Sequence, residues 1–337
     1  MPCCSGCRGR AATESVPADS RAAALVAAAR DGDARSLARL ISQVENGSPE
    51  LRPVMRAITP YPGHAHIVGL TGSPGVGKST VTAALVGAYR AVARRVAVLA
   101  VDPTSPFTGG ALLGDRVRMQ DHAADRGVFI RSMASRGHLG GLAVAAPQAL
   151  RILDATGFDV ICVETVGVGQ AEVEIASLAD TTLVITAPGM GDSIQAAKAG
   201  ILEIADIFVV NKSDRPGAQD VVRDLRNMLA MARYSEGDWK PPIVSASATT
   251  GEGIDELAGR LDQHWEWLGE SGERDRRRLG RAREEVSAIA VAGMRRQIGG
   301  LLGQSRLDDL AAQVANGKLD PYSAADELTG TNNCNGP

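Results

Sequence analysis

The sequence predicts an α/β fold: a mostly parallel central sheet with helices on both faces, an N-terminal helical extension and a C-terminal helical dimerisation arm. From about residue 66 to residue 267, short apolar runs alternate with segments of helical spacing. Parallel strands require crossover helices, so this alternation indicates helices on both faces. Several apolar runs also end in glycine-rich or polar segments, as strands do where such sheets bind ligands.

The segment from Gly72 to Ser79 matches the phosphate-binding pattern G-x-x-x-x-G-K-S. An apolar run precedes it and a helical segment follows it, which is the context that the pattern requires. Lys78 is expected to reach the outer phosphates as a catalytic residue, and Ser79 to hold Mg²⁺. We therefore predict a P-loop NTPase fold, since backbone N–H groups and a helix N-terminus favour bound phosphate. The expected phosphate-site residues are Gly72, Ser73, Pro74, Gly75, Val76, Gly77, Lys78, Ser79 and Thr80.

A second motif, Asn211-Lys212-Ser213-Asp214, follows the apolar run 207–210 and predicts how the base is read. The Asp214 carboxylate would accept hydrogen bonds from N1–H and the exocyclic amine of guanine, whereas adenine offers neither donor in that arrangement. Lys212 would lay its alkyl stem over the base plane. Asn211 is expected to tie loops together rather than to contact the base.

A further apolar run, 242–244, ends in three small residues. Their size would let a backbone N–H approach O6 of guanine. The expected residues are Ser245, Ala246 and Ser247. Alone, either base-reading segment is also compatible with an ordinary turn.

Carboxylates near the ends of two other strands are candidates for binding Mg²⁺, which commonly takes one or two carboxylates together with phosphates and water. Asp102 follows the run 96–101, and Asp115 lies in the glycine-rich segment after it, which we interpret as a first switch loop. A turn cap for Asp102 and a helix N-cap for Asp115 are the alternatives.

Glu164 ends another apolar run and is followed three residues later by Gly167. This spacing fits a Walker B carboxylate that helps to bind Mg²⁺ and a glycine whose N–H contacts the γ-phosphate. Val168 stands where Ras-like enzymes carry a water-orienting glutamine, and valine cannot orient water. We therefore expect slow intrinsic hydrolysis that a partner accelerates or gates.

Composition favours one large α/β domain with flanking helices, since the 337 residues are 44% hydrophobic. The net charge of −3 gives no reason to expect nucleic acid as a partner. No apolar run is long enough to span a membrane and no secretion signal is expected, so a cytoplasmic protein is predicted. The expected regions are a disordered head (1–19), an N-terminal helical segment (20–60), a nucleotide-binding domain (61–268), a C-terminal helical region (269–328) and a disordered tail (329–337).

The C-terminal region begins with an arginine run, 274–278, which we interpret as a solvated helix face. Apolar residues then recur at helical spacing, so this stripe is buried either on its own domain or in a homodimer arm. The stripe comprises Val286, Ile289, Ala290, Met294, Ile298 and Leu301. Among the cysteines, Cys3, Cys4 and Cys7 are read as a reduced tail rather than a metal site, and Cys162 as buried.

Together, these motifs resemble the methylmalonyl-CoA mutase-associated GTPases, the MeaB/ArgK/MMAA family, over about residues 20–325. The resemblance rests on 72–79, 101–110, 113–116, 164–170, 211–214 and 245–247. It implies GTP or GDP as ligand with Mg²⁺, and a homodimer formed through C-terminal helices. It also implies a G-protein chaperone that binds adenosylcobalamin-dependent methylmalonyl-CoA mutase or a related acyl-CoA mutase. Such a protein would protect the mutase and gate cofactor delivery from a cobalamin adenosyltransferase.

The resemblance further implies a mobile loop from Pro188, in which Gln195 and Lys198 respond to the nucleotide and assist activation. One departure is the serine of Asn-Lys-Ser-Asp, where alanine is commoner. The resemblance implies that this position makes no contact with the base.

Three other functions stay open. A metal-inserting maturation GTPase would need more ligands than the two imidazoles of His64 and His66. An ATPase or kinase linked to cationic amino-acid transport would need phosphotransfer to a protein, and the sequence has no His-Arg-Asp motif to orient an acceptor. A binding module without turnover is disfavoured by Lys78, Ser79 and Glu164.

Overall fold

The computed structural model describes residues 18–103, 122, 124–135, 141–165, 171–189, 204–301 and 303–329. Seven strands form one sheet in the order β3-β2-β4-β1-β5-β6-β7, and every pairing between them is parallel. The prediction of a mostly parallel sheet with helices on both faces is confirmed. The strands are β1 (His66–Thr71), β2 (Val96–Pro103), β3 (Val128–Ser135), β4 (Val160–Thr165), β5 (Thr181–Thr186), β6 (Ile207–Val210) and β7 (Ile243–Ser245).

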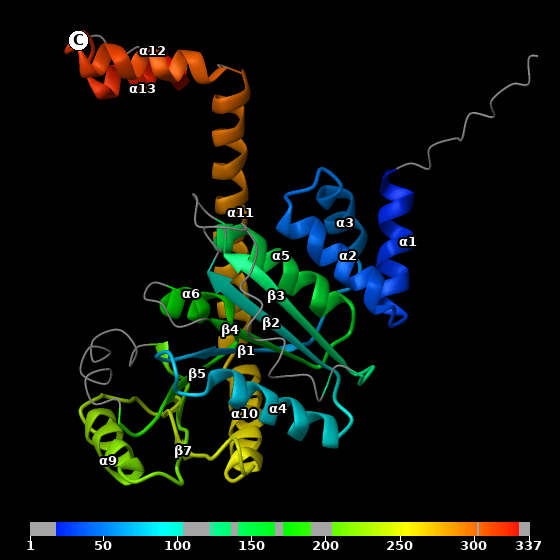
Figure 1. Cartoon of the computed structure of the whole chain (residues 1–337), viewed down its shortest axis with the longest axis vertical. Helices are drawn as coiled ribbons and strands as arrows, with labels where there is room; N and C mark the ends of the chain where they lie inside the picture. The colour runs from blue at the N-terminus through cyan, green and yellow to red at the C-terminus, as the bar shows by residue number, and fades with distance from the viewer. Residues whose placement is uncertain are drawn as a thin grey trace, which may run out of the picture.

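Helices cover both faces of this sheet and extend beyond it (Figure 1). Before and within the sheet they are α1 (Ala18–Arg30), α2 (Ala34–Glu45), α3 (Leu51–Ile58), α4 (Lys78–Ala91), α5 (Gly141–Ala155), α6 (Ala171–Leu178), α9 (Ala218–Leu229) and α10 (Ile254–Glu270). Three more follow: α11 (Glu273–Leu301), α12 (Gly303–Ala315) and α13 (Pro321–Thr329).

Alternation of side chains along each strand divides the core between the two faces. On β1, Ile67 packs into the cluster formed with α5 and α6, whereas Val68 and Leu70 pack into the cluster formed with α4 and α10. All six residues of β1 are buried. Strands covered on both sides in this way read as continuous apolar runs, which explains why the sequence pattern located them.

The N-terminal helices α1, α2 and α3 form a small unit that packs on α5. Asp33 caps α2, because its carboxylate accepts hydrogen bonds from the N–H groups of Arg35 and Ser36. An ion pair of 2.5 Å between Arg131 of β3 and Glu45 of α2 joins this unit to the edge of the sheet. The expected helical segment is therefore helical, while the proposed domain boundaries stay a prediction.

The start of α11 docks on the sheet through its arginines, so the expectation of a solvated face is wrong for Arg277 and Arg278. Arg277 donates to the carboxylate of Asp206 at 2.9 and 3.0 Å, and Arg278 donates to the carbonyl oxygen of Ala65 at 3.0 Å. Arg281 pairs with Asp180, which is fully buried. The sequence could not show this contact, because it joins a late helix to the residues that precede β5 and β6.

These arginines keep a buried carboxylate ionised. Burial alone would raise the pKa of Asp180, but Arg281 and Arg278 outweigh it and hold that pKa below its ordinary value. Asp180 also accepts a hydrogen bond from the N–H of Ile67. One carboxylate thus joins α11 to the beginning of β1.

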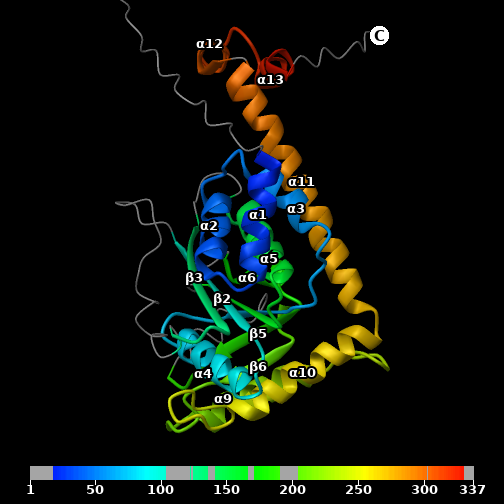
Figure 2. The same ribbon diagram turned by 90° about the vertical axis from the view of Figure 1, so that its right-hand side faces the viewer.

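The later part of α11 extends away from the sheet, with α12 and α13 at its far end (Figures 1 and 2). Val286, Ile289 and Met294 of the predicted stripe are 68%, 37% and 62% exposed. Their own domain therefore does not bury them, while the side chains of Ile298 and Leu301 lie outside the described part. In the described residues, no helix is long and apolar enough to cross a membrane.

Candidate nucleotide-binding site

The strand order brings the predicted motifs together at the carboxyl edge of the sheet, where α/β sheets bind ligands. β1 leads into the glycine-rich loop and pairs with β4, so that Leu70 lies beside Glu164. On the other side of β1 follow β5, β6 and β7, and Val210 at the end of β6 pairs with Ser245. The expected phosphate and base residues therefore meet at one edge.

Two glycines of the loop allow close packing that a side chain would prevent. Gly72 has φ +140°, and a Cβ there would lie 2.1 Å from the carbonyl oxygen of Ile185. Gly77 has φ +94° and directly precedes α4, and a Cβ there would lie 2.4 Å from Nδ2 of Asn211. The loop can thus approach both β5 and the Asn211 segment only with glycine at these positions.

Lys78 and Ser79 begin α4, and both are buried. The Nζ of Lys78 donates to the carbonyl oxygens of Gly72 and Ser73 at 2.7 and 3.3 Å. The ammonium group therefore lies folded over the loop that is predicted to hold the phosphates.

Glu164 is 3% exposed and faces the start of α4. Its Oε1 accepts a 2.5 Å hydrogen bond from Ser79 Oγ, and its Oε2 accepts one of 3.2 Å from Thr82 Oγ1. A hydroxyl beside a carboxylate is a donor set of hard oxygens, which fits Mg²⁺. Thr82 was not expected from the motif, since it lies beyond the end of the pattern.

On the base side, Asn211 joins loops, as expected. Its Nδ2 donates to the carbonyl oxygen of Val76 at 2.8 Å, and its Oδ1 accepts from the N–H of Ala248 at 3.1 Å. Lys212 adopts φ +58°, and its Nζ donates to the carbonyl oxygen of Gly75 at 2.7 Å. Asp214 is exposed, and its carboxylate has no side-chain partner among the described residues.

Backbone N–H groups of the small-residue loop have partners within the protein. The N–H of Ala246 donates to Val210 at 2.9 Å and that of Ser247 donates to Glu252 at 2.9 Å, so both are used within the protein. One residue later, the N–H of Ala248 donates to Oδ1 of Asn211, so it too is used within the protein. The register of β7 against β6 decides that Val210 takes the N–H of Ala246, which a pattern of small residues does not show.

Several predicted residues lie outside the described part. They are Asp115, Gly167, Gln195 and Lys198. Asp102 is placed by its backbone at the end of β2, opposite Ala134 of β3, but its side chain is not described. Cys162 is fully buried in β4, and burial raises the pKa of its thiol to about 12. Among the described residues, no group of three or more His, Cys, Asp or Glu is placed to hold a metal ion.

Comparison with known proteins gives a consistent result. The family model described as methylmalonyl Co-A mutase-associated GTPase MeaB matches residues 37–298. A protein of Pyrococcus horikoshii that carries a GTPase name is 49% identical over 304 residues, covering 90% of this chain and 95% of its own. The GTPase ArgK of Escherichia coli is 39% identical over 235 residues, covering 68% and 71%. A crystal structure described as LAO/AO transport system kinase superposes with a TM-score of 0.68 at 26% identity, covering 94% of this chain and 99% of that one.

Proposed function

Because the chain belongs to the family of methylmalonyl-CoA mutase-associated GTPases, we propose that it is a GTP-hydrolysing chaperone of methylmalonyl-CoA mutase or a related acyl-CoA mutase. In this proposal, GTP hydrolysis times the loading of the mutase with its cobalamin cofactor and protects the mutase. The observation that carries it is the family match over residues 37–298, which spans the whole candidate site. A cobalamin adenosyltransferase would be a further partner.

We propose that the carboxyl edge of the sheet binds GTP and GDP. Lys78 would swing from the carbonyl oxygens of Gly72 and Ser73 to the β- and γ-phosphates, since a phosphate is a stronger acceptor for an ammonium group. Backbone N–H groups of the loop and the start of α4 would hold the remaining phosphate oxygens.

Ser79 and Glu164 would hold Mg²⁺, Ser79 directly and Glu164 directly or through a water molecule. When bound, Mg²⁺ neutralises charge on the phosphate oxygens. The hydrogen bond between Ser79 Oγ and Glu164 Oε1 holds both groups at one point. Asp102 and Asp115 are further candidates on the sequence alone.

Guanine would lie against Asp214, whose exposed carboxylate can accept from N1–H and the 2-amino group. Lys212 would cover the base with its stem, because its hydrogen bond to Gly75 draws that stem across the loop. A main-chain donor from the segment Ser245 to Ser247 would serve O6, exchanging its present partner within the protein for the base.

Intrinsic hydrolysis would be slow, because Val168 cannot position water. Docking of the mutase would then position the attacking water, acting through Gly167, Gln195 and Lys198. A cytoplasmic location and the lack of nucleic-acid partners stay predictions from the sequence.

A homodimer through the C-terminal helices is supported by the exposed stripe of α11. Besides Val286 and Met294, Leu307 of α12 and Tyr322 of α13 are 48% and 84% exposed. Replacing Met294 by Asp should convert a dimer to a monomer in light scattering, whereas Glu284→Lys on the same helix should not. A monomeric native protein would contradict this assembly.

The chaperone role is tested by single-turnover GTP hydrolysis with and without the mutase, apo and cofactor-loaded. We expect the mutase to accelerate hydrolysis, and Lys78→Ala to abolish both nucleotide binding and the stimulated rate. If hydrolysis occurs but no form of the mutase changes its rate, the GTPase assignment survives and the chaperone assignment fails.

A further inference from the structure

A pocket of about 600 Å³ lies at the edge of the sheet opposite the candidate nucleotide site. Asp206, which directly precedes β6, lines it, whereas Asn211 and Asp214 follow the other end of that strand. The remaining lining comes from the segment 232–241, the end of α10 and the start of α11. Its volume lies within the range of about 300–1,000 Å³ that is usual for ligand sites.

Aromatic side chains are concentrated in this pocket. The sequence has only three tryptophans and four tyrosines, yet Trp239, Trp267 and Tyr234 all line it. The centroids of the two indole rings lie 5.8 Å apart. Electron-rich ring faces of this kind attract organic cations.

Both indole N–H groups are used to hold the rings in place. Trp239 Nε1 donates to the carbonyl oxygen of Asp206 at 2.7 Å, and Trp267 Nε1 donates to that of Gly237 at 3.0 Å. The carboxylate of Asp238 accepts from the N–H of Ser235 at 2.6 Å, which holds together the loop 235–238 that precedes Trp239. The rings are therefore positioned before any ligand arrives, which lowers the entropy cost of binding.

The net charge of the lining is negative, because it contains four carboxylates and only two guanidinium groups. Arg277 pairs with Asp206 and Glu273, and Arg276 pairs with Glu273. Glu236 and Asp238 have no cationic partner among the described residues.

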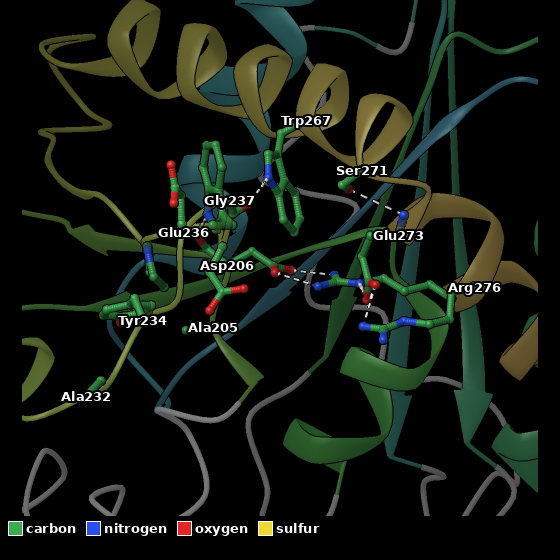
Figure 3. A pocket seen from close by; sticks show the side chains of 14 residues that line it. Ala205, Asp206, Ala232, Tyr234, Glu236, Gly237, Trp267, Ser271, Glu273 and Arg276 are labelled. Atoms are coloured by element: carbon green, nitrogen blue, oxygen red, sulfur yellow. Dashed lines mark hydrogen bonds and ion pairs between the residues drawn. The ribbon is translucent and has the colours of Figure 1, made fainter.

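Glu236 lies apart from Arg276, which also lines the pocket. Figure 3 shows Glu236 and Tyr234 on one side of the pocket and Glu273 and Arg276 on the other. The basic residues of the same segment, Arg233 and Lys240, are not part of the lining.

The imidazole ring of His264, which packs against Trp239 and Trp267, carries no charge at neutral pH. His264 is fully buried, with its ring centroid 4.6 Å from that of Trp239 and 5.5 Å from that of Trp267. Burial lowers the pKa of His264 to about 4. It therefore does not repel a cation in the pocket.

From this arrangement we propose that the pocket binds an organic cation, a guanidinium or alkylammonium group. The apolar part of the guest would pack on Tyr234, Trp239 and Trp267, and its charge would face Glu236 and Asp238. The source would be an arginine or lysine side chain of a partner protein, or a free small cation. This site is separate from the nucleotide site, so the proposal does not depend on GTP binding.

Tryptophan fluorescence of the full chain, without nucleotide, tests the proposal, since two of the three tryptophans line the pocket. Butylguanidinium should give a saturable change, and butylurea, a neutral molecule of the same shape, should bind at least five-fold more weakly. Glu236→Gln should weaken butylguanidinium binding by about five-fold, the upper range for an exposed charge pair. Glu284→Gln, the same charge change on an exposed site of α11, should leave it unchanged.

Equal binding of butylguanidinium and butylurea, the absence of a saturable signal, or equal effects of the two variants would overturn the proposal. Unchanged thermal unfolding of Glu236→Gln ensures that a lost signal reports binding, because Glu236 is exposed. A capped arginine tripeptide that binds more tightly than free arginine would assign the source to a partner protein, and the reverse order would assign it to a small molecule.

Discussion

The side-chain amide of Asn211 donates a 2.8 Å hydrogen bond to the carbonyl oxygen of Val76. This bond joins the segment that follows β6 to the loop that follows β1, across 135 positions of sequence. Asn211 is 2% exposed, so water cannot easily replace the amide. Together with the hydrogen bond from Lys212 Nζ to the carbonyl oxygen of Gly75, this contact sets the position of the Asn211 segment relative to the glycine-rich loop.

Replacing Asn211 by Ala should lower the affinity for both GTP and GDP by about ten-fold or more, since the buried carbonyl oxygen of Val76 and the partly buried N–H of Ala248 lose their partner. Calorimetric titration measures the loss. Ser213→Ala is the matched control, because Ser213 contributes its backbone N–H to the fold. Unchanged affinity of the Asn211 variant would show that the two loops are held together by other contacts.

Replacing Asp214 by Asn should lower GTP affinity by about 100-fold, because an amide cannot accept from both N1–H and the 2-amino group. The same variant should gain affinity for xanthosine triphosphate, whose 2-oxo group accepts from the new amide N–H. Competition binding measures both changes, with Asp224→Asn on α9 as control. A variant that keeps full preference for GTP would place the base away from Asp214.

Replacing Arg281 by Ala should destabilise the fold by about 3 kcal/mol, because the fully buried Asp180 loses a charged partner. Denaturant unfolding gives the free energy. Arg283 is exposed on the same helix, so Arg283→Ala should change stability little. Equal effects of the two variants would mean that Arg278 alone neutralises Asp180.

Stability should fall as the pH is lowered from about 6.5 to 4.5. Burial lowers the pKa of His66 to about 3 and that of His264 to about 4, so the unfolded chain takes up protons in this range and the folded chain does not. Each histidine should contribute a slope of up to about 1.4 kcal/mol per pH unit. Urea unfolding at several pH values measures it.

The variant His264→Asn should reduce this slope, whatever it does to stability at pH 7. Both rings hydrogen-bond to Thr181 Oγ1, at 2.6 Å from His66 and 2.7 Å from His264, and this hydroxyl can donate to only one of them. Carboxylates begin to titrate near the lower end of this range, so the variant is compared with the original chain at each pH. An unchanged slope in the variant would mean that His264 is already protonated when folded.

Local patterns in the sequence predicted six of the seven strands and located the glycine-rich loop and the Asn211–Asp214 motif, whereas the edge strand β3 (Val128–Ser135) was not predicted. The run before Gly72 lies in a strand buried on both faces, so it is continuously apolar and easy to recognise. The loop needs glycine where φ is positive, as at Gly77, and the pattern G-x-x-x-x-G-K-S specifies glycine at that position. Each of these signals depends on neighbouring residues.

Contacts between distant segments were decided by the tertiary structure alone. From the sequence, Arg277 and Arg278 were interpreted as a solvated face. In the structure α11 lies across the starts of β5 and β6, where Arg277 pairs with Asp206 and Arg278 pairs with Asp180. Strand register likewise decides that the N–H of Ala246 donates to Val210. Periodicity shows that a helix has a charged face, but only the packed chain decides what lies opposite that face, because that partner can come from any part of the sequence.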